Sequence, residues 1–585
     1  MNRRFEGQTR RRFLATATAG GMAVTAGCLD RLVGGSSNGA TQLSLTVKSV
    51  PSDEDPQAAE IARRFTEVLS EIGIDVSFVP RAAPQFSRDV FYGDEFDVFV
   101  ERSPIIDDPS VLTALLHSSF AEVDGIWLNP FGFEHDEVDS LIDTAVRESA
   151  ETKQQTLDTL QKFIAGDLVP FSVVGLPDEL TAVGTALPPS RQPEGLSTAT
   201  DLLHLGESGE SPPMESFDIG VMNGQLIADL NPIRWHHPLQ STIVDLIYDP
   251  LIRMDTDAEQ GWISNGIVWQ EEDDATQAEV FIREGLTWQD GSSLDAADVA
   301  FTYSFLRDLT GGDYATRIPA GQYAGKIAHV KSVEFIEDHR VRFTFEDVLR
   351  SNARRALTVP IFPEHIWSER IGVDESGISL AASQTIPAPV GSGPFAVADI
   401  EPAQQLRLDR YQEHVAFSEM NGLPAPPFET IRFTVPTRPP NVGTAVNMIA
   451  NGELDLLANV PADATRPVVL NAQVDLEARA GRQYYLLGFN TRKEPFDDPA
   501  LRRAFGRLLD RTFLTATAFG GFGTPAESPL AGSEWATDEL TWSGESVLGR
   551  FPGSGGHVRA DEARDFFTDL GFAFDPDLRA IVFDD

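Results

Sequence analysis

Residues that could do chemistry are few in this chain. Ten histidines and one cysteine are spread over 585 residues, and the chain has no Gly-x-Ser-x-Gly, His-Glu-x-x-His or Gly-Lys-Ser/Thr phosphate loop. Residues 391–393, Gly-Ser-Gly, lack a lysine or a partnering histidine, which favours a backbone turn over a nucleophile. His236 and His237 are adjacent and would face opposite ways on a strand, so the pair does not predict a metal site. We therefore predict no catalytic residue, no metal and no cofactor, and expect that the chain is not an enzyme.

Acidic residues dominate the charge of the chain. There are 89 acidic and 46 basic residues, a net charge of −43, so acidic pairs such as Asp107-Asp108 carry almost no catalytic signal. One cationic ligand site cannot account for an excess of this size. At about 1 M ionic strength the Debye length is roughly 3 Å, so a surface adapted to high salt would be screened from self-repulsion. The charge thus predicts a halophilic source, and it argues against nucleic acid as a partner.

The first 42 residues have the features of an export signal followed by a tether. Arg10 and Arg11 precede Phe13-Leu14 and a weakly apolar segment that is too short to span a bilayer, which needs roughly 20 apolar residues. Cys28 follows directly, and its context resembles a lipoprotein box; the alternative is a stray thiol in a discarded signal. We expect a twin-arginine lipoprotein signal over 1–28, a lipid at Cys28 and a polar tether over 29–42. The protein would then be anchored to the outer face of the cytoplasmic membrane, and with twin-arginine export the acidity suggests a halophilic archaeon.

Hydrophobic periodicity predicts a strand, a helix and a second strand at the start of the folded part. Apolar residues alternate over 43–47, recur at helical spacing over 61–72, and alternate again at 76–78. This pattern is typical of a βαβ unit. A further strand is expected at 96–100, followed by two helical stretches that Pro170 closes. Residues 186–214 have the Pro, Gly and Ser content of a linker.

Residues 280–303 combine a strand, a turn and a capped helix in a fixed spacing. Val280 and Ile282 lie in a β-rich run, Asp290-Gly291 marks a turn, and Asp295 stands three residues before Asp298 at a helix start. The ordered combination resembles the signature region of the peptide/nickel-type solute-binding proteins of ABC importers.

Further motifs in order extend this resemblance over some 290 residues. The family tends to show an Asp/Asn-Pro after an opening strand, a Tyr-x-x-Leu, a Gly-Thr-Gly-Pro-Tyr turn, a Gly-Glu-x-Asp, and an Asn before Pro-Phe-x-Asp. This chain has Asn231-Pro232, Tyr248 to Leu251, Val390 to Phe395, Gly452 to Asp455, and Asn490 before Pro495 to Asp498.

The order of the segments departs from the family. The βαβ unit at 43–80 resembles a part that in the family follows the helix and hairpin seen here at 560–583. One copy of each part favours circular permutation over duplication, and a linker of about 29 residues spans roughly 30 Å as a coil. The alternative is an accidental fusion of unrelated domains.

The resemblance implies a two-lobed α/β fold of the periplasmic-binding-protein type II class, in the peptide-binder subclass with an inserted subdomain. We expect 436–585 to be the first half of lobe III and 43–169 its second half, so that the lobe is assembled across the permutation. The other expected parts are the return to lobe I and the linker at 170–215, lobe I at 216–255 and 385–435, and the inserted subdomain II at 256–384.

The resemblance also places segments in the ligand cleft. The segment 222–237, the strand end Phe489-Asn490 and the loop 101–109 should reach it. The candidate ligand-binding residues are Arg102, Asn223, Trp235, His236, Phe489 and Asn490. Trp235 could stack on a ligand or fill the core, and Asn490 could bind ligand or cap a strand end.

The loop 101–109 differs from oligopeptide binders in two places. Ile105 stands where those proteins have an aspartate for the peptide amine, and Arg102 stands where an aromatic is usual. An arginine would be a bidentate partner for a carboxylate or phosphate of the ligand. Arg102 could equally pair with Glu101 or a surface acid.

These observations predict a lipid-anchored receptor that hands a peptide or another small solute to the permease subunits of an ABC importer. One rival is a sensing or structural surface lipoprotein of the same fold without transport. A less favoured rival is an extracellular hydrolase, for which the sequence offers no nucleophile, base and orienting group.

Overall fold

The computed structural model describes residues 42–583 except for some short segments. The segments outside the described residues are 107, 122–127, 194, 197, 206–213, 235–236, 256–257, 273–274, 311–320, 373–378, 387, 418–425 and 427. The predicted signal with Arg10 and Arg11, the lipid site Cys28 and most of the tether therefore lie outside the described residues. The candidates Trp235 and His236 lie outside them as well.

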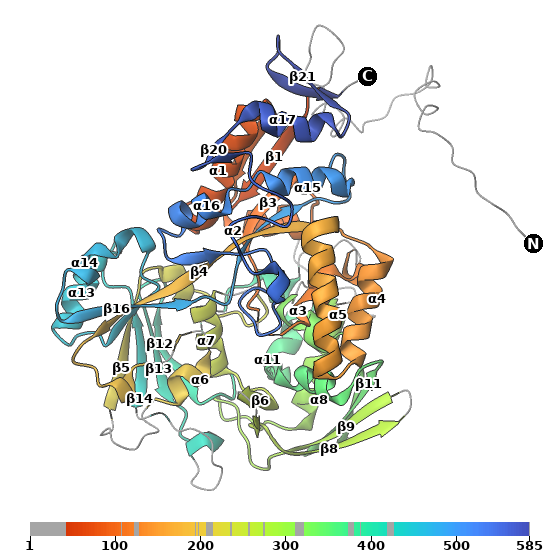
Figure 1. Ribbon diagram of the computed structural model, residues 1–585. Coiled ribbons are helices and arrows are strands. Elements are labelled where there is room, and N and C mark those ends of the chain that lie inside the picture. The colour runs from red at the N-terminus through yellow and green to blue at the C-terminus, as the bar shows by residue number, and fades with distance from the viewer. Residues whose placement is uncertain are drawn as a thin grey trace, which may run out of the picture.

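The fold is a mixed α/β fold, as expected, with helices packed around one large sheet and one smaller one (Figure 1). The α-helices are α1 (Pro56–Ile72), α2 (Ala83–Phe91), α3 (Val111–Leu116), α4 (Asp136–Arg147), α5 (Ala150–Lys162), α6 (Ala199–Leu203), α7 (Pro238–Ile247), α8 (Ala296–Thr310), α9 (Gly321–Ile327), α10 (Arg350–Ala353), α11 (Glu364–Trp367), α12 (Leu380–Ser383), α13 (Val442–Ala450), α14 (Arg466–Val469), α15 (Pro499–Arg507), α16 (Arg511–Ala518) and α17 (Ala560–Thr568). The strands are β1 (Ser44–Ser49), β2 (Asp75–Pro80), β3 (Val98–Arg102), β4 (Phe171–Gly184), β5 (Met214–Val221), β6 (Ile252–Asp255), β7 (Ala258–Gly261), β8 (Ser264–Glu272), β9 (Ala275–Ile282), β10 (Val330–Glu337), β11 (Arg340–Glu346), β12 (Phe395–Glu401), β13 (Gln405–Arg410), β14 (Phe428–Thr434), β15 (Leu456–Ala458), β16 (Val474–Ala480), β17 (Tyr485–Phe489), β18 (Gly523–Pro525), β19 (Gly553–Ser554), β20 (His557–Val558), β21 (Phe572–Asp575) and β22 (Ala580–Phe583).

The predicted βαβ unit is confirmed as β1, α1 and β2. Strands β1 and β2 pair in parallel along their whole length. Asp55 caps α1 by accepting hydrogen bonds from the amides of Gln57 and Ala58, and Pro56 starts the helix with a fixed φ. Gly73 ends it at φ 98°, in the left-handed region that favours glycine. The apolar face of α1 is buried against the sheet, so the periodicity read from the sequence is the packing that forms.

The large sheet runs through the whole molecule in the order β12-β13-β14-β5-β15-β4-β17-β3-β1-β2. We use lobe I for the body that holds β5 and β12–β15, and lobe III for the body that holds β1–β3 and β17. Subdomain II is the body built on the second sheet, in the order β10-β11-β9-β8. Strand β4 pairs with β15 near one end and with β17 near the other, so it passes from lobe III to lobe I.

The first and the last strands that the structure describes meet in lobe III. The Leu43 amide donates to the Ile581 carbonyl at 2.9 Å, and the Ile581 amide donates to the Gly73 carbonyl at 2.8 Å. Gln42 and Val582 form an antiparallel bridge. Figure 1 shows α1 and β1, in red, beside α17, in dark blue, at the end of the molecule away from subdomain II. Segments more than 500 residues apart along the chain thus share one apolar core.

One expected division differs from the packing. The sequence analysis placed all of 436–585 in lobe III, whereas β15 pairs in parallel with β5 of lobe I and β16 pairs with the lobe I end of β4. Helix α13 packs beneath these strands in a separate apolar cluster. The physical reason is that the chain changes lobes between β16 and β17, not at residue 436.

The strand, turn and helix predicted over 280–303 are present. They are the end of β9, a turn closed by the bridge between Thr287 and Ser293, and helix α8. The Asp295 carboxylate accepts from the Ala297 amide at 2.7 Å, and the Asp298 carboxylate accepts from the Asp295 amide at 3.2 Å. Asp298 also accepts from the indole of the fully buried Trp288, so the cap is anchored in the core of subdomain II.

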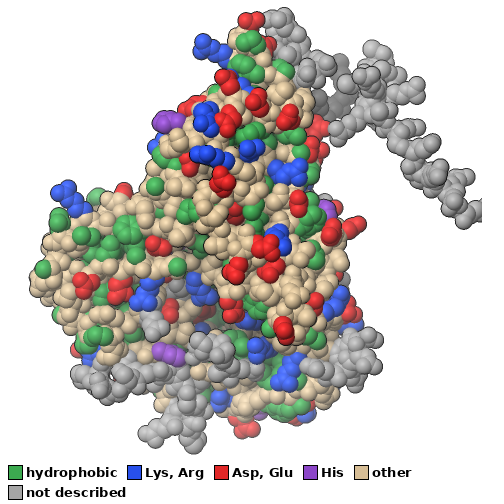
Figure 2. All heavy atoms as spheres, in the orientation of Figure 1, with side chains coloured by type: hydrophobic (Ala, Val, Ile, Leu, Met, Phe, Trp, Pro, Cys, Tyr) green, Lys and Arg blue, Asp and Glu red, His purple; other side chains and the backbone are tan. Residues whose placement is uncertain are grey.

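Acidic and basic side chains are spread over the visible surface. Figure 2 shows Asp and Glu side chains dispersed over the visible face, with Lys and Arg between them and no single acidic patch. Such a distribution is what a solvated acidic surface requires. Among the residues that the structure describes, no helix combines the length and apolar character needed to cross a bilayer.

Candidate functional site

Arg102 lies in a polar cluster where β3 ends, α1 begins and β17 begins. Its Nη2 donates to Gln57 Oε1 at 3.1 Å and to the Tyr485 hydroxyl, and it lies 3.6 Å from Asp55 Oδ2. The guanidinium also sits 4.9 Å from the centroid of the Tyr485 ring. We call Asp55, Gln57, Glu101, Arg102 and Tyr485 the strand-end cluster.

Backbone topology gathers this cluster. Strands β1 and β3 are parallel neighbours, so their carboxyl ends and the start of α1 meet at one edge of the sheet. Antiparallel β17 enters at the same edge, with Tyr485 directly opposite Arg102. The Tyr485 hydroxyl lies 2.9 Å from both carboxylate oxygens of Asp55 and 2.8 Å from Gln57 Oε1. The helix cap and the strand end are therefore locked together.

The cluster faces lobe I. Burial and the positive charge of Arg102 together hold the pKa of His237 well below its ordinary value. His237 precedes α7 of lobe I and caps it by accepting from the Leu239 amide at 3.3 Å. The charge of Glu179 in β4 also acts on Arg102. Groups from both lobes and from the connecting strand thus interact with one arginine.

Glu101 adds an unusual carboxyl group. Burial, together with repulsion from Asp55, raises its pKa to about 8. Among the described residues its side chain makes no hydrogen bond or ion pair. At neutral pH this carboxyl group is mostly protonated, and a cationic or hydrogen-bonding group of a ligand would compensate its burial.

Replacing Glu101 with glutamine should remove a pH dependence of stability. The folded state holds this proton up to about pH 8, whereas the unfolded chain loses it near the ordinary glutamate pKa of 4.5. The Glu101 contribution to the free energy of unfolding therefore falls as pH rises through this window. We expect Glu101→Gln to be more stable than the native chain by about 1 to 3 kcal/mol above pH 8, and about equal at pH 4.

Chemical denaturation of the ligand-free protein between pH 4 and pH 9 measures this difference. The exposed Glu545, changed to glutamine, is the control and should track the native chain at every pH. A Glu101→Gln curve parallel to that of the native chain would remove this account of Glu101.

Phe489 and Asn490 do not reach a cavity. Phe489 is fully buried and packs on Phe496 and Phe505. Asn490 is also fully buried, and its Nδ2 donates to Asp94 Oδ1 at 2.7 Å and to the Phe96 carbonyl at 2.9 Å. Of the two roles left open for Asn490, these contacts favour the strand-end cap. For Phe489 they favour a place in the core of lobe III.

Asn223 is half-buried and caps its own turn, where Oδ1 accepts from the Gln225 amide at 2.9 Å. It is not among the side chains around Arg102. Of the predicted residues, the structure therefore brings Arg102 close to the end of segment 222–237, at His237. The sequence analysis did not single out Asp55, Glu101 or Tyr485 as site residues. Only the Asp55-Pro56 helix start carried a local signal, and that signal concerned capping.

The two-lobed fold and the strand-end cluster together indicate a class of protein. Two lobes joined by β4 present charged and hydrogen-bonding groups to each other, and the described part of the site offers no nucleophile with a base. That is the arrangement of a binding protein whose lobes close on a ligand.

Residues 262–572 match the family model for the middle region of bacterial extracellular solute-binding proteins, family 5. The chain belongs to this family, which confirms the resemblance read from the motifs and agrees with the expectation that it is not an enzyme. The matched residues cover subdomain II, much of lobe I and the carboxyl-terminal part of lobe III, but not 43–261.

Individual relatives are distant. The oligopeptide-binding protein AppA of Bacillus subtilis is 26% identical over 257 residues, 43% of each protein. The glutathione-binding protein GsiB of Salmonella paratyphi A is 21% identical over 326 residues, 54% of this chain and 56% of that protein. The chain thus spans about half the length of the curated relatives that it matches.

Two solved structures are also distantly similar to this chain. The oligopeptide-binding protein AppA from Bacillus subtilis in complex with a nonapeptide is 20% identical, with a TM-score of 0.42 over 62% of this chain and 65% of that one. NikZ from Campylobacter jejuni in complex with Ni(L-His) is 16% identical, with a TM-score of 0.42 over 62% and 64%.

Proposed function

We propose that this chain is an extracellular receptor, lipid-anchored at Cys28, that captures a peptide or another small solute and delivers it to an ABC importer. The observation that carries the proposal is the family match over 262–572. The relatives include an oligopeptide-binding, a glutathione-binding and a haem-binding protein, so relatives of this chain bind several classes of ligand. Export by the twin-arginine route and a halophilic source belong to this proposal and rest on the sequence.

Circular permutation is part of the same proposal. The hydrogen bonds between Leu43 and Ile581, and between Ile581 and Gly73, support it, because both chain ends contribute to one lobe. The ends of the described part of the chain, which the bridge between Gln42 and Val582 joins, lie in that lobe, away from subdomain II (Figure 1). Permutation therefore leaves the strand-end cluster and the connecting strand β4 intact.

Arg102 is the side chain that we propose for the anionic part of the ligand. Its Nη2 is held by Gln57 and Tyr485, but among the described residues Nε and Nη1 make no hydrogen bond. The side chain keeps 23% of its surface exposed. Tyr485 and Asp55 thus orient the guanidinium, while one edge stays available for a carboxylate or phosphate.

Changing Arg102 to alanine should weaken binding of an anionic solute by about 1.5 to 3 kcal/mol, because a charge-assisted contact is lost. Calorimetry with the solute that co-purifies with the native protein measures the change. Arg479→Ala, at an exposed arginine of β16 paired with Glu477, is the control and should bind normally. Unchanged affinity in Arg102→Ala would dismiss the role.

A sensing lipoprotein of the same fold would bind solute without handing it on. The two functions differ in their partners, so the gene neighbourhood separates them. Adjacent genes for a permease and an ATPase support import, and their absence supports sensing.

A further inference from the structure

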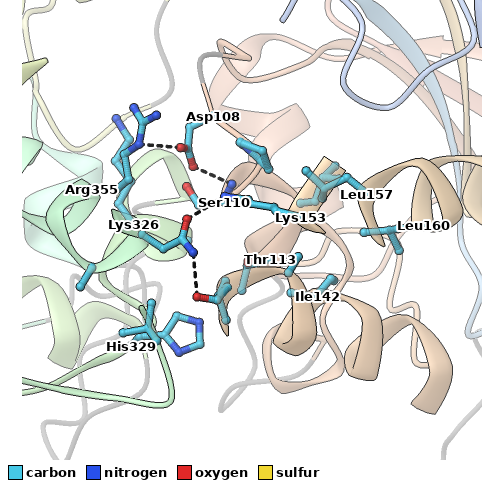
Figure 3. A pocket seen from close by; sticks show the side chains of 18 of the residues that line it. Asp108, Ser110, Thr113, Ile142, Lys153, Leu157, Leu160, Lys326, His329 and Arg355 are labelled. Carbon is cyan, nitrogen blue, oxygen red and sulfur yellow. Dashed lines mark hydrogen bonds and ion pairs between the residues drawn. The ribbon is translucent and has the colours of Figure 1, made fainter. Parts of the chain in front are cut away.

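A cavity lies between lobe III and subdomain II. Its enclosed part is small, about 30 Å³, and the wider empty space of about 560 Å³ around it is open to solvent. Helices α3, α4 and α5 form one wall, and α9, β11, α10 and the 3-10 turn Arg354–Thr358 form the other. Figure 3 shows Lys153, Leu157 and Leu160 on one side, with Arg355, Lys326 and His329 on the other. The described cavity lining includes no residue of the strand-end cluster.

The charge of this cavity is opposite to that of the chain. Its lining includes Lys153, Lys326 and Arg355, and Asp108 is the single acidic residue among the described residues that line it. The whole chain has 89 acidic residues and only six lysines, two of which are here. A lining with a positive excess inside so acidic a protein points to an anion.

Asp108 does not neutralise the cavity. Its carboxylate lies 2.9 Å from Arg355 Nε, and it also accepts from the Ser110 amide at 2.7 Å. These contacts connect lobe III to subdomain II, and they engage the Asp108 carboxylate with Arg355 and the Ser110 amide. The positive charge of Lys153 is left without an equal partner.

Lys153 is buried, with 6% of its surface exposed. Its Nζ donates to Asn352 Oδ1 at 2.9 Å and lies 4.9 Å from the centroid of the Trp535 ring. Among the described residues no carboxylate lies within ion-pair distance of it. Burial lowers its pKa, and a bound anion would reverse that shift. An ammonium group with three donors therefore has capacity for another acceptor.

His329 supplies a second free polar atom. Its Nε2 is buried and has no hydrogen-bond partner among the described residues. Burial lowers the pKa of the ring, so it is neutral near pH 7 and can donate a hydrogen bond without adding charge. Most of the remaining lining is apolar, and Ile142, Leu157 and Leu160 belong to the buried core of lobe III.

We propose that this cavity is a second solute site that binds a small organic monocarboxylate. The carboxylate lies at Lys153, and the short hydrocarbon part packs on Leu157 and Leu160. The ligand contacts both walls, so it stabilises the junction of lobe III and subdomain II. The described lining includes no residue of the strand-end cluster, although Asp108 and Pro109 end the loop 101–109 that begins at that cluster. The proposal does not depend on what the cleft binds.

Calorimetry of the full chain with butyrate, and with neutral butyramide in the same salt, tests the proposal. Butyrate should show one binding component that does not depend on Arg102, and butyramide should bind there at least about tenfold more weakly, because it lacks the charge that meets Lys153. Lys153→Met should weaken butyrate by about tenfold or more. Lys162→Met, on the same helix but exposed, should leave butyrate binding unchanged.

Two further variants keep the test decisive if Lys153→Met folds poorly. Ala145→Leu places a larger side chain at the buried cavity wall and should block butyrate. Arg102→Ala removes any butyrate bound in the cleft and should leave the binding component that depends on Lys153 as it is. No binding to the native chain, equal binding of butyrate and butyramide, or loss in Arg102→Ala but not in Lys153→Met or Ala145→Leu would overturn the proposal.

Discussion

Phe567→Ala should lower the free energy of unfolding by about 3 to 5 kcal/mol. Phe567 lies in α17 near the carboxyl end of the chain, and only 1% of its surface is exposed. Its ring packs edge-on to Phe505 at 5.2 Å and near Phe572. The same apolar cluster contains Leu43, Val47 and much of α1. A cavity made at the carboxyl end should therefore loosen the amino-terminal βαβ unit.

Amide hydrogen exchange in β1, together with chemical denaturation, measures this coupling. The neighbouring Phe566 is half-buried beneath the Arg507 guanidinium, so Phe566→Ala is a matched control that should cost about 1 kcal/mol. Unchanged exchange in β1 of the Phe567→Ala variant would show that the two chain ends fold independently.

Arg511→Met should destabilise the protein by about 3 to 5 kcal/mol through a different mechanism. Arg511 and Glu527 form a buried ion pair at 3.4 Å, with side-chain exposures of 2% and 4%. Arg511 Nε also donates to the Val173 carbonyl of β4 at 2.7 Å. Removing the arginine leaves a buried carboxylate without its counter-ion beside the strand that joins the lobes.

The double variant Arg511→Met, Glu527→Gln separates lost charge pairing from lost packing. It should recover a large part of the stability lost in Arg511→Met, because no unpaired charge remains in the interior. Denaturation midpoints of the two single variants and the double variant give the coupling. Equal losses in Arg511→Met and in the double variant would show that packing, not charge, accounts for the effect.

The parts of the fold that local rules govern could be read from the sequence. The spacing of Asp295 and Asp298 predicts a helix start, and both carboxylates do cap α8. The apolar period of 61–72 predicts the buried face of α1. These features depend on neighbours within a few residues, so one sequence contains them.

Features set by distant segments could not be read in this way. Residues 436–480 belong to lobe I because β15 pairs with β5, and no local sequence pattern predicts this pairing. The family resemblance predicts that Phe489 and Asn490 reach the cleft. In the structure both are fully buried, and Asn490 is hydrogen-bonded to the Phe96 carbonyl. The approach of His237 to Arg102 and the cavity around Lys153 arise from packing between bodies.

Arg102 could be predicted as a candidate from the sequence, but its contacts could not. Its charge and its place in the loop marked it as a candidate, and the structure puts it where groups from both lobes act on it. Its acidic partner is Asp55, not the adjacent Glu101. Neighbouring residues on a strand point to opposite faces, whereas the start of α1 lies at the same sheet edge as Arg102.

Native mass spectrometry of the protein, purified at high salt and incubated with an extract of the medium in which its source grows, tests the central claim most directly. A receptor of this class should show a species heavier than the bare chain by one small solute, and Arg102→Ala should reduce that species. The mass of the bare chain alone, under every condition that keeps it folded, would contradict the account.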